Sequence, residues 1–179
     1  MRGLVVYESM FGNTHEVALA IAEGIATRMD VDVIEIDQAP AVLAPDVALR
    51  VVGGPTHAHG MTTAKSRADA ARRAGPRLVS RGDGVREWLD SIRPTAAPIP
   101  AATFDTRIKG PEILWGSAAK SAAKRVRELG FRLVESPRSF LVGGPTGPLY
   151  DRLVDGELER ARAWGAGLAD KVAEPATTR

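Results

Sequence analysis

The sequence predicts an α/β protein, a three-layer doubly wound sandwich in which a five-stranded parallel sheet carries helices on both faces. Two observations lead to this prediction. Strand-like segments alternate along the chain with segments that have helical spacing of apolar residues, an order typical of parallel sheets. The strand-like segments are also nearly continuous apolar runs, as expected where helices cover both faces of a sheet.

Five segments are predicted to form the strands. Gly53 and Gly54, followed by Pro55, are expected to end the third strand sharply. Pro137 interrupts the last segment, which suits a bulge or a sheet edge because proline cannot donate a backbone hydrogen bond. The strand segments comprise residues 5–7, 31–36, 49–52, 101–104 and 132–142.

Apolar residues at helical spacing predict the helices. Gly130 is expected to end the helix before it. Residues 57–85 are the hardest part to interpret, although they contain an Ala/Arg-rich stretch that favours a helix over 63–73. The main predicted helices are residues 14–28, 85–92, 117–129 and 155–172.

Length and composition indicate one globular domain. A chain of 179 residues can bury a hydrophobic core without stabilisation by disulfides or a metal ion. We assign the domain to residues 1–174 and expect a frayed end at residues 175–179. The chain has no cysteine, which excludes disulfides, thiolate catalysis and cysteine-ligated metals. No apolar run is long enough for a signal sequence or a membrane span, so we expect a cytoplasmic protein without membrane contacts.

Charge is distributed unevenly although the net charge is only +2. Residues 1–48 hold eight acidic and two basic residues, a net charge of −6. Residues 65–86 and 107–127 each carry a net charge of +5. Such segments are usually solvated helix faces, but clustered arginine can also attract an acidic partner or an anionic substrate. Nucleic acid is not expected, because aromatic residues do not interleave with the bases.

The loop after the first strand has the features of a phosphate-binding site. A strand, a tight loop and a helix N-terminus together point backbone NH groups and the positive end of the helix dipole at one place. Ser9 and Thr14 add hydroxyl groups, and Gly12 allows close backbone approach. A plain helix start is the alternative, because Asn13 followed by Glu16 has the spacing of a capping box.

Three loops fall at the carboxyl ends of predicted strands, namely residues 8–14, 53–61 and 105–110. In doubly wound sheets, ligands bind beyond these ends, near the point where the strand order reverses. The convergence of the three loops favours the phosphate interpretation over a simple cap.

These loops, in this order, make the chain resemble the flavodoxin-like family over essentially its whole length. The first loop is similar to the family pattern hydroxyl-x-hydroxyl-Gly-x-Thr, with a phenylalanine in place of one hydroxyl. The resemblance implies FMN as cofactor, its phosphate bound by Ser9, Asn13, Thr14 and backbone NH groups. The loop residues concerned are Ser9, Met10, Phe11, Gly12, Asn13 and Thr14.

The resemblance implies that the second loop lies against the inner face of the isoalloxazine ring, where the family commonly has tryptophan in place of His57. Plain loop residues and a metal site are the other interpretations of the two histidines, and no third metal ligand is evident. The residues of this loop expected to contact the cofactor are Pro55, Thr56, His57, Ala58, His59 and Gly60.

The third loop resembles the one whose backbone contacts the pyrimidine edge of the flavin. Phe104 is included in it, although its side chain suits the core as the last inward residue of its strand. Asp105, Thr106 and Arg107 are the better candidates for contact with the flavin.

The resemblance implies an electron-transfer protein that cycles FMN between oxidised, semiquinone and hydroquinone states and passes electrons between redox partner proteins, as a monomer or weak homodimer. An NAD(P)H-dependent FMN quinone reductase of the WrbA type is the alternative, although such enzymes carry a long glycine-rich third loop that this chain lacks. A flavodoxin-fold binding module without cofactor is the third possibility. If the basic segments border the flavin, we expect a less negative reduction potential and an acidic partner or anionic substrate.

Overall fold

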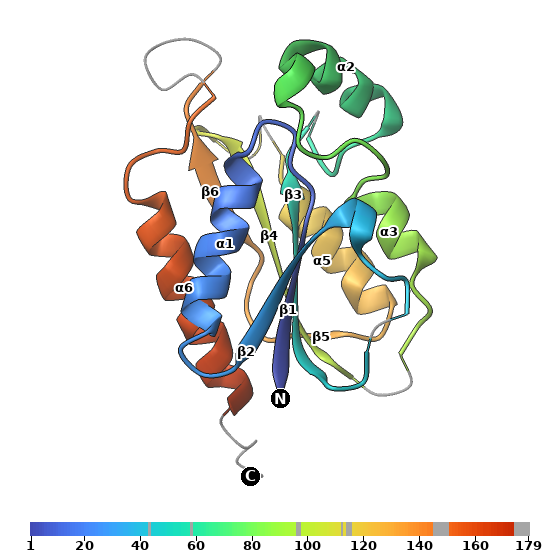
Figure 1. The fold of residues 1–179 in the computed structure, drawn as a ribbon, viewed down its shortest axis with the longest axis vertical. Coiled ribbons are helices and arrows are strands. Elements are labelled where there is room, and N and C mark those ends of the chain that lie inside the picture. The colour runs from blue at the N-terminus through green and yellow to red at the C-terminus, as the bar shows by residue number, and fades with distance from the viewer. Residues whose placement is uncertain are drawn as a thin grey trace.

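A computed structural model describes residues 1–173 except for 43, 58, 96, 97, 112, 114, 115 and 145–150. The chain forms a three-layer α/β sandwich (Figure 1). In chain order the elements are β1 (Arg2–Tyr7), α1 (Asn13–Ile25), β2 (Asp30–Glu35), η1 (Ile36–Gln38), β3 (Val47–Pro55), α2 (Ala64–Ala74), η2 (Gly75–Arg77), α3 (Val85–Ser91), β4 (Pro100–Ile108), α5 (Ala118–Glu128), β5 (Arg132–Leu133), β6 (Arg138–Val142) and α6 (Glu157–Ala173).

The strands are parallel and have the order β2-β1-β3-β4-β5, with β6 also paired to β4. This confirms the predicted doubly wound parallel sheet. β5 pairs with the first part of β4 and β6 with the last part, so the two together occupy the fifth position. The break between them contains Pro137, in agreement with the predicted interruption.

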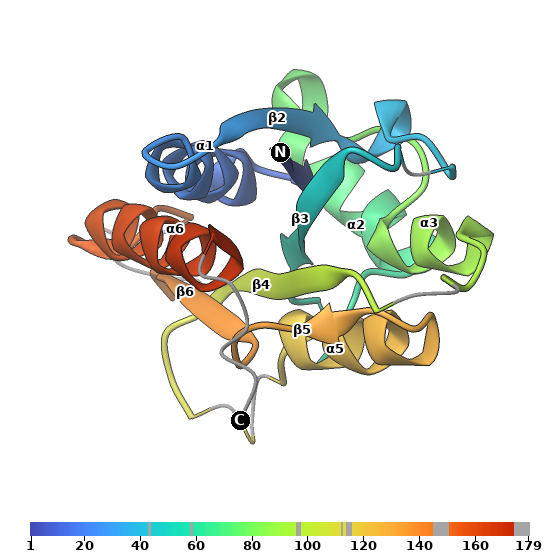
Figure 2. The same ribbon diagram turned by 90° about the horizontal axis from the view of Figure 1, so that it is seen from below.

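Helices cover both faces of the sheet (Figure 2). α1 and α6 pack on one face, around Val5, Val51 and Phe104. α3 and α5 pack on the other face, around Val6 and Val52. Successive strand residues point to opposite faces, so an uninterrupted apolar strand serves two cores at once. Among the described helices, none combines the length and the apolar character that crossing a membrane requires.

Two strands extend beyond their predicted ends. β3 does not stop at Gly53 but continues to Pro55, and β4 continues past Phe104 to Ile108 because β6 pairs with it there. The glycine in β3 is required by packing and not by a turn. A Cβ atom at Gly53 would lie 2.2 Å from the ring of Phe104.

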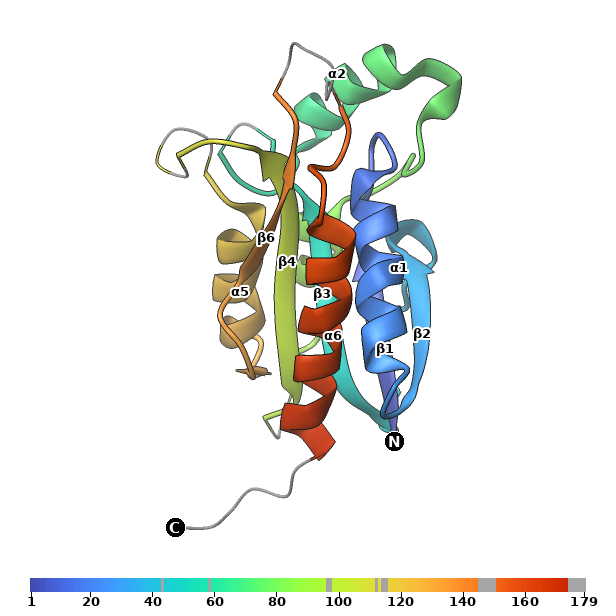
Figure 3. The ribbon, with the colours of Figure 1, turned by 90° about the vertical axis from the view of Figure 1, so that its left-hand side faces the viewer.

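α2 has an unusual position, because it does not lie along the sheet as the other main helices do. Figure 3 shows it above the carboxyl ends of the strands, while α1 and α6 run side by side along the sheet. Its start is well defined, since Thr63 Oγ1 accepts a hydrogen bond from Ser66 N at 3.2 Å and Ser66 Oγ accepts from Thr63 N at 2.9 Å. The predicted helix over 63–73 is therefore present and lies over the edge of the sheet where ligands bind in this class of fold.

The close approach of α1 and α6 depends on glycine. A Cβ atom at Gly165 would lie 2.1 Å from the carbonyl oxygen of Ile21, whereas a Cβ atom at Gly167, in the same helix, would meet nothing within 4 Å. We expect Gly165→Ala to lower the free energy of unfolding by about 1 to 3 kcal/mol through overpacking. The matched variant Gly167→Ala should be neutral or stabilising by up to about 1 kcal/mol, since alanine favours helices. Urea unfolding measures both, and equal effects of the two variants would contradict this packing.

Candidate functional site

The loop between β1 and α1 is built around the hydroxyl group of Ser9. This side chain is fully buried, and its Oγ accepts hydrogen bonds from the backbone N of Gly12 at 3.1 Å and of His15 at 3.3 Å. Gly12 has a positive φ of 98°, a conformation that glycine adopts without strain. Ser9 Oγ therefore stabilises the turn as a hydrogen-bond acceptor, and its own hydroxyl proton remains available for donation.

Val79 and Ser80, which follow α2 in the chain, form hydrogen bonds with the same loop. Ser9 N donates to Ser80 Oγ at 2.9 Å, and Ser80 N donates to Ser9 O at 2.8 Å. Val79 N also donates to Met10 O at 3.2 Å. These bonds fix the loop whether or not a ligand is present.

α1 begins without a capping box, in contrast to the alternative that the sequence allowed. Gly12 is the N-cap and provides no side-chain hydrogen bond, and Asn13 is already the first helical residue. The Asn13 amide donates instead to Asp151, to the backbone O at 3.2 Å and to Oδ1 at 3.3 Å. Neither Gly12 nor Asn13 therefore caps the positive end of the helix dipole with its side chain.

Four backbone NH groups of this loop remain open. Within the residues that the structure describes, the amides of Met10, Phe11, Asn13 and Thr14 donate to no protein acceptor. We call these four groups the open amides. A helix N-terminus leaves backbone donors free, and a cluster of them beside a cavity is suited to binding an anion.

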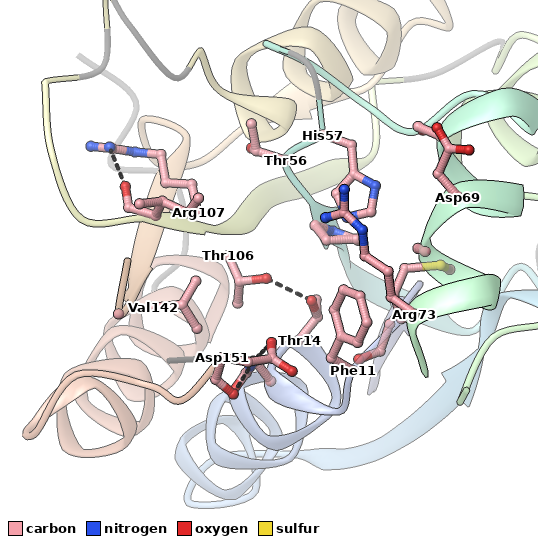
Figure 4. A pocket seen from close by; sticks show the side chains of 18 of the residues that line it. Phe11, Thr14, Thr56, His57, Asp69, Arg73, Thr106, Arg107, Val142 and Asp151 are labelled. Carbon is pink, nitrogen blue, oxygen red and sulfur yellow. Dashed lines mark hydrogen bonds between the residues drawn. The ribbon is translucent and has the colours of Figure 1, made fainter. Parts of the chain in front are cut away.

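The loop borders a cavity of about 440 Å³ at the carboxyl edge of the sheet (Figure 4). Most of the side chains proposed from sequence to bind a cofactor come together here. Thr14 Oγ1 lies 2.7 Å from Thr106 Oγ1, which joins the first loop to the end of β4. The sequence-predicted residues that line the cavity are Ser9, Met10, Phe11, Asn13, Thr14, Pro55, Thr56, His57, His59, Thr106 and Arg107.

Other predicted residues lie outside this lining. Phe104 is in the core, with its ring centroid 6.2 Å from that of Phe140 and 6.5 Å from that of Trp164. Gly12 and Gly60 shape their loops without lining the cavity. Ala58 lies outside the described residues.

Asp105 has a structural position beneath the site and does not line the cavity. Its carboxylate is fully buried, and Oδ2 accepts from Thr56 Oγ1 at 3.0 Å, Ser117 Oγ at 2.7 Å and Ala119 N at 2.9 Å. It faces α5 because side chains alternate along a strand, and Asp105 is a strand residue, not a loop residue as predicted. Its role is to join the end of β3 to the start of α5.

A tight turn follows β3. His57 N donates to Gly60 O at 3.0 Å and Gly60 N donates to His57 O at 3.2 Å, while His59 has a positive φ of 77°. Burial, and then the positive charge of Arg73, lower the pKa of the His57 imidazole. His57 is therefore held in its neutral form near pH 7 and presents an uncharged ring to the cavity.

α2 contributes a wall of the cavity that the sequence did not predict, through Ser66, Asp69, Ala70 and Arg73. The only available signal was the high positive charge of residues 65–86. Val142, the last residue of β6, and the following Gly143 and Gly144 also line the cavity, as does Asp151. The described lining therefore comes from the stretches 9–14, 55–59, 66–73, 106–108 and 142–144 together with Asp151.

Glu8, directly after β1, anchors the base of α2. Its carboxylate is buried, and it accepts from Thr62 Oγ1 at 2.6 Å and from Val85 N at 2.9 Å. Arg67 of α2 donates to Thr62 Oγ1 and to Glu87, each at 3.1 Å. Burial raises the pKa of the Glu8 carboxyl, against the opposing effect of these hydrogen bonds.

The raised pKa of Glu8 gives a pH signature. The folded protein holds the Glu8 proton more tightly than the unfolded chain, so its contribution to stability is complete below the unfolded pKa and is lost as the pH rises through the folded pKa. We expect Glu8→Gln to gain stability relative to wild type as the pH rises above the unfolded pKa of about 4.3, measured by urea unfolding. The exposed Glu159→Gln serves as the control. Parallel profiles for wild type and Glu8→Gln would contradict this assignment.

Solved structures of other proteins have the same fold as this chain. No protein-family model matches the sequence, and no curated protein matches it significantly. A flavodoxin from the domain Archaea is similar in structure, with a TM-score of 0.65 and 21% identity over 97% of this chain and 100% of that one. Flavodoxin 2 from Bacillus cereus has a TM-score of 0.66 and 20% identity over 96% and 99%.

A WrbA-like protein from Agrobacterium tumefaciens is also similar, with a TM-score of 0.52 and 20% identity over 94% of this chain and 95% of that one. The two flavodoxins therefore superpose more closely than the WrbA-like protein. At these identities the likeness concerns the fold. The chain has the flavodoxin-like fold.

Proposed function

We propose that this protein binds FMN and uses it for electron transfer. The observation that carries the proposal is the group of open amides, which lies at a helix N-terminus without a capping box and borders a cavity large enough for a cofactor. Flavodoxins with the same fold support the identity of the ligand. Bound FMN would supply one- and two-electron chemistry, and the protein would supply position and electrostatics.

The phosphate would be held by the open amides together with the hydroxyl groups of Ser9 and Thr14. No lysine or arginine is present in this loop, so the affinity would come from charge-assisted hydrogen bonds and the helix dipole. His57 and Thr106, which both line the cavity, are the residues that would hold the ring. Because His57 is neutral, it can pack against an aromatic face without adding charge.

Two uses of FMN are compatible with this site. A carrier passes electrons between redox partner proteins through an exposed ring edge, and the flavodoxin likeness supports it. An NAD(P)H-dependent quinone reductase would need access for a substrate to the bound flavin, past the α2 residues that line the cavity. Reduction of the FMN-loaded protein in small steps, followed by absorbance, distinguishes them: two separate one-electron steps favour a carrier, and rapid reduction by NADPH with quinone turnover favours a reductase.

The contribution of the phosphate can be measured without altering the protein. We expect FMN to bind at least roughly 100-fold more tightly than riboflavin, since two charge-assisted hydrogen bonds of about 1.5 kcal/mol each give a factor of that size. Thr14→Val should weaken FMN binding about tenfold and leave riboflavin binding unchanged. Fluorescence titration gives the four dissociation constants, for wild type and Thr14→Val with FMN and with riboflavin. Equal affinity of wild type for the two flavins would contradict phosphate binding, and absence of flavin binding would leave the binding module without cofactor.

Asp151 should make FMN binding depend on pH. Its carboxylate lines the cavity and contacts Asn13, and burial raises its pKa. An ionised carboxylate opposes a bound phosphate, so affinity should fall as the pH rises through the pKa of Asp151. Asp151→Asn should bind FMN more tightly than wild type above that pH, and the difference should vanish below it. Asparagine tolerates the positive φ of 53° at this position.

Riboflavin is the control for this variant because it lacks the phosphate. Its affinity should be the same for wild type and Asp151→Asn at every pH. A gain in affinity for both flavins would show that the variant changes the pocket and not the repulsion of the phosphate.

A further inference from the structure

Glu35, the last residue of β2, is connected to the loop between β1 and α1 although it does not line the cavity. Its Oε1 accepts a hydrogen bond from the hydroxyl group of Ser80, and its Oε2 accepts from Asp37 N at 2.9 Å. The same Ser80 Oγ accepts from Ser9 N at 2.9 Å. Two hydrogen bonds through a single serine therefore join the end of β2 to the start of this loop.

The carboxylate of Glu35 fixes the direction of both hydrogen bonds. An ionised carboxylate accepts hydrogen bonds and cannot donate them, whereas a serine hydroxyl has one proton and two acceptor sites. Because the Ser80 proton is directed to Glu35, Ser80 Oγ can face Ser9 N only as an acceptor. Ser80 is only 3% exposed, so water competes little for either bond.

Ser9 is held on both sides of its Cα atom by Ser80. Its N donates to Ser80 Oγ, and its O accepts from Ser80 N at 2.8 Å. These two bonds place the Ser9 side chain where its Oγ accepts from the backbone N of Gly12 and of His15. The turn that presents the open amides to the cavity therefore depends on Ser9, and the position of Ser9 depends on Ser80.

The charge of Glu35 gives no direct benefit to an anion site. Its partners among the described residues are neutral donors, a hydroxyl group and a backbone NH group, so no ion pair offsets its charge. By charge alone, a carboxylate close to a phosphate weakens phosphate binding. The ability to accept without donating is the property of Glu35 that serves the loop.

Asp37 provides a matched comparison at the same end of β2. Its Oδ2 accepts from Gly82 N at 2.9 Å and from Arg81 N at 3.2 Å. A neutral carbonyl oxygen can accept these backbone donors equally well, because an NH group donates in one direction only. The charge of Asp37 is therefore not needed to direct its hydrogen bonds, in contrast to that of Glu35.

We propose that Glu35 is a positioning residue for phosphate recognition, which acts through Ser80 and sets the geometry of the open amides. The inference rests on the proposed function, because the phosphate concerned is that of FMN. Glu35 does not line the cavity, so its effect on the ligand passes through the hydrogen-bonded loop. Its contribution is to hold the donors in place before the ligand arrives.

The main experiment compares Glu35→Gln with Asp37→Asn by fluorescence titration with FMN and with riboflavin. Glutamine has the size of glutamate but can donate as well as accept, so it no longer fixes the direction of the Ser80 hydroxyl. We expect Glu35→Gln to weaken FMN binding about 3- to 10-fold, the effect of one hydrogen bond, and to leave riboflavin binding unchanged. Asp37→Asn should bind FMN at least as tightly as wild type. If charge alone acted, both variants would bind FMN more tightly.

A double-mutant cycle tests whether Glu35 acts through Ser80. Ser80→Ala removes the connecting hydroxyl and should weaken FMN binding about tenfold, again without effect on riboflavin. Addition of Glu35→Gln to this variant should cause no further loss, because residues that act in one chain of hydrogen bonds are not additive. Thermal unfolding confirms that each variant is folded.

Amide hydrogen exchange of the ligand-free protein tests the same connection without a flavin. The amides of Ser9 and Gly12 should exchange faster in Glu35→Gln than in wild type, since their hydrogen bonds are held less firmly. In Asp37→Asn both amides should exchange at the wild-type rate.

Four results would overturn the inference. They are unchanged or tighter FMN binding by Glu35→Gln, equal loss of FMN and riboflavin affinity, additive losses in the double variant, and unchanged exchange of the Ser9 and Gly12 amides in Glu35→Gln. Failure of wild type to bind FMN would defeat the proposed function instead. The exchange measurement would then still show whether Glu35 holds the loop.

Discussion

The first turn of an α-helix presents NH groups that need acceptors, and this requirement dominates the carboxyl edge of the sheet. Gly12 enters α1 in a left-handed conformation and provides no side-chain cap. Ser9 accepts from the backbone of Gly12 and His15 and leaves the open amides without a protein partner. The open amides border the cavity, where solvent can reach them. A bound anion would replace solvent with charge-assisted hydrogen bonds, which is the basis of the proposed phosphate site.

The rest of the site depends on how firmly this loop is held. Ser80 fixes the backbone of Ser9 through two hydrogen bonds, one from Ser9 N to Ser80 Oγ and one from Ser80 N to Ser9 O. Glu8 connects the end of β1 to the starts of α2 and α3. The segment between β3 and α3 therefore both supports the loop between β1 and α1 and forms a wall of the cavity. The helix α2 of this segment thus lies over the carboxyl edge of the sheet, beside the cavity (Figure 3).

Much of the fold could be predicted because strand and helix periodicities are local properties of the sequence. The strand ends could not be predicted, since long-range packing decides them. Gly53 looked like a turn residue but lies within β3, against the ring of Phe104. Asp105 looked like a loop residue, but pairing with β6 keeps it in β4, and its carboxylate faces α5.

The same limit applies to the cavity. The three loops were expected to converge because carboxyl ends of parallel strands share one edge. The position of α2 could not be predicted from the sequence. This 11-residue helix is rich in alanine and arginine and has no apolar stripe that would indicate what it packs against. Its arginines could be recognised only as a charged segment.

The most direct test of the central claim is the proton–nitrogen NMR spectrum of the backbone amides during titration with FMN. The account predicts that the amide protons of the open amides move downfield as they form hydrogen bonds to the phosphate. The amides of Gly12 and His15, which already donate to Ser9 Oγ, should move much less. Riboflavin should leave both groups nearly unchanged. Equal shifts with FMN and riboflavin, or shifts confined to the turn at His57, would contradict a phosphate site at the start of α1.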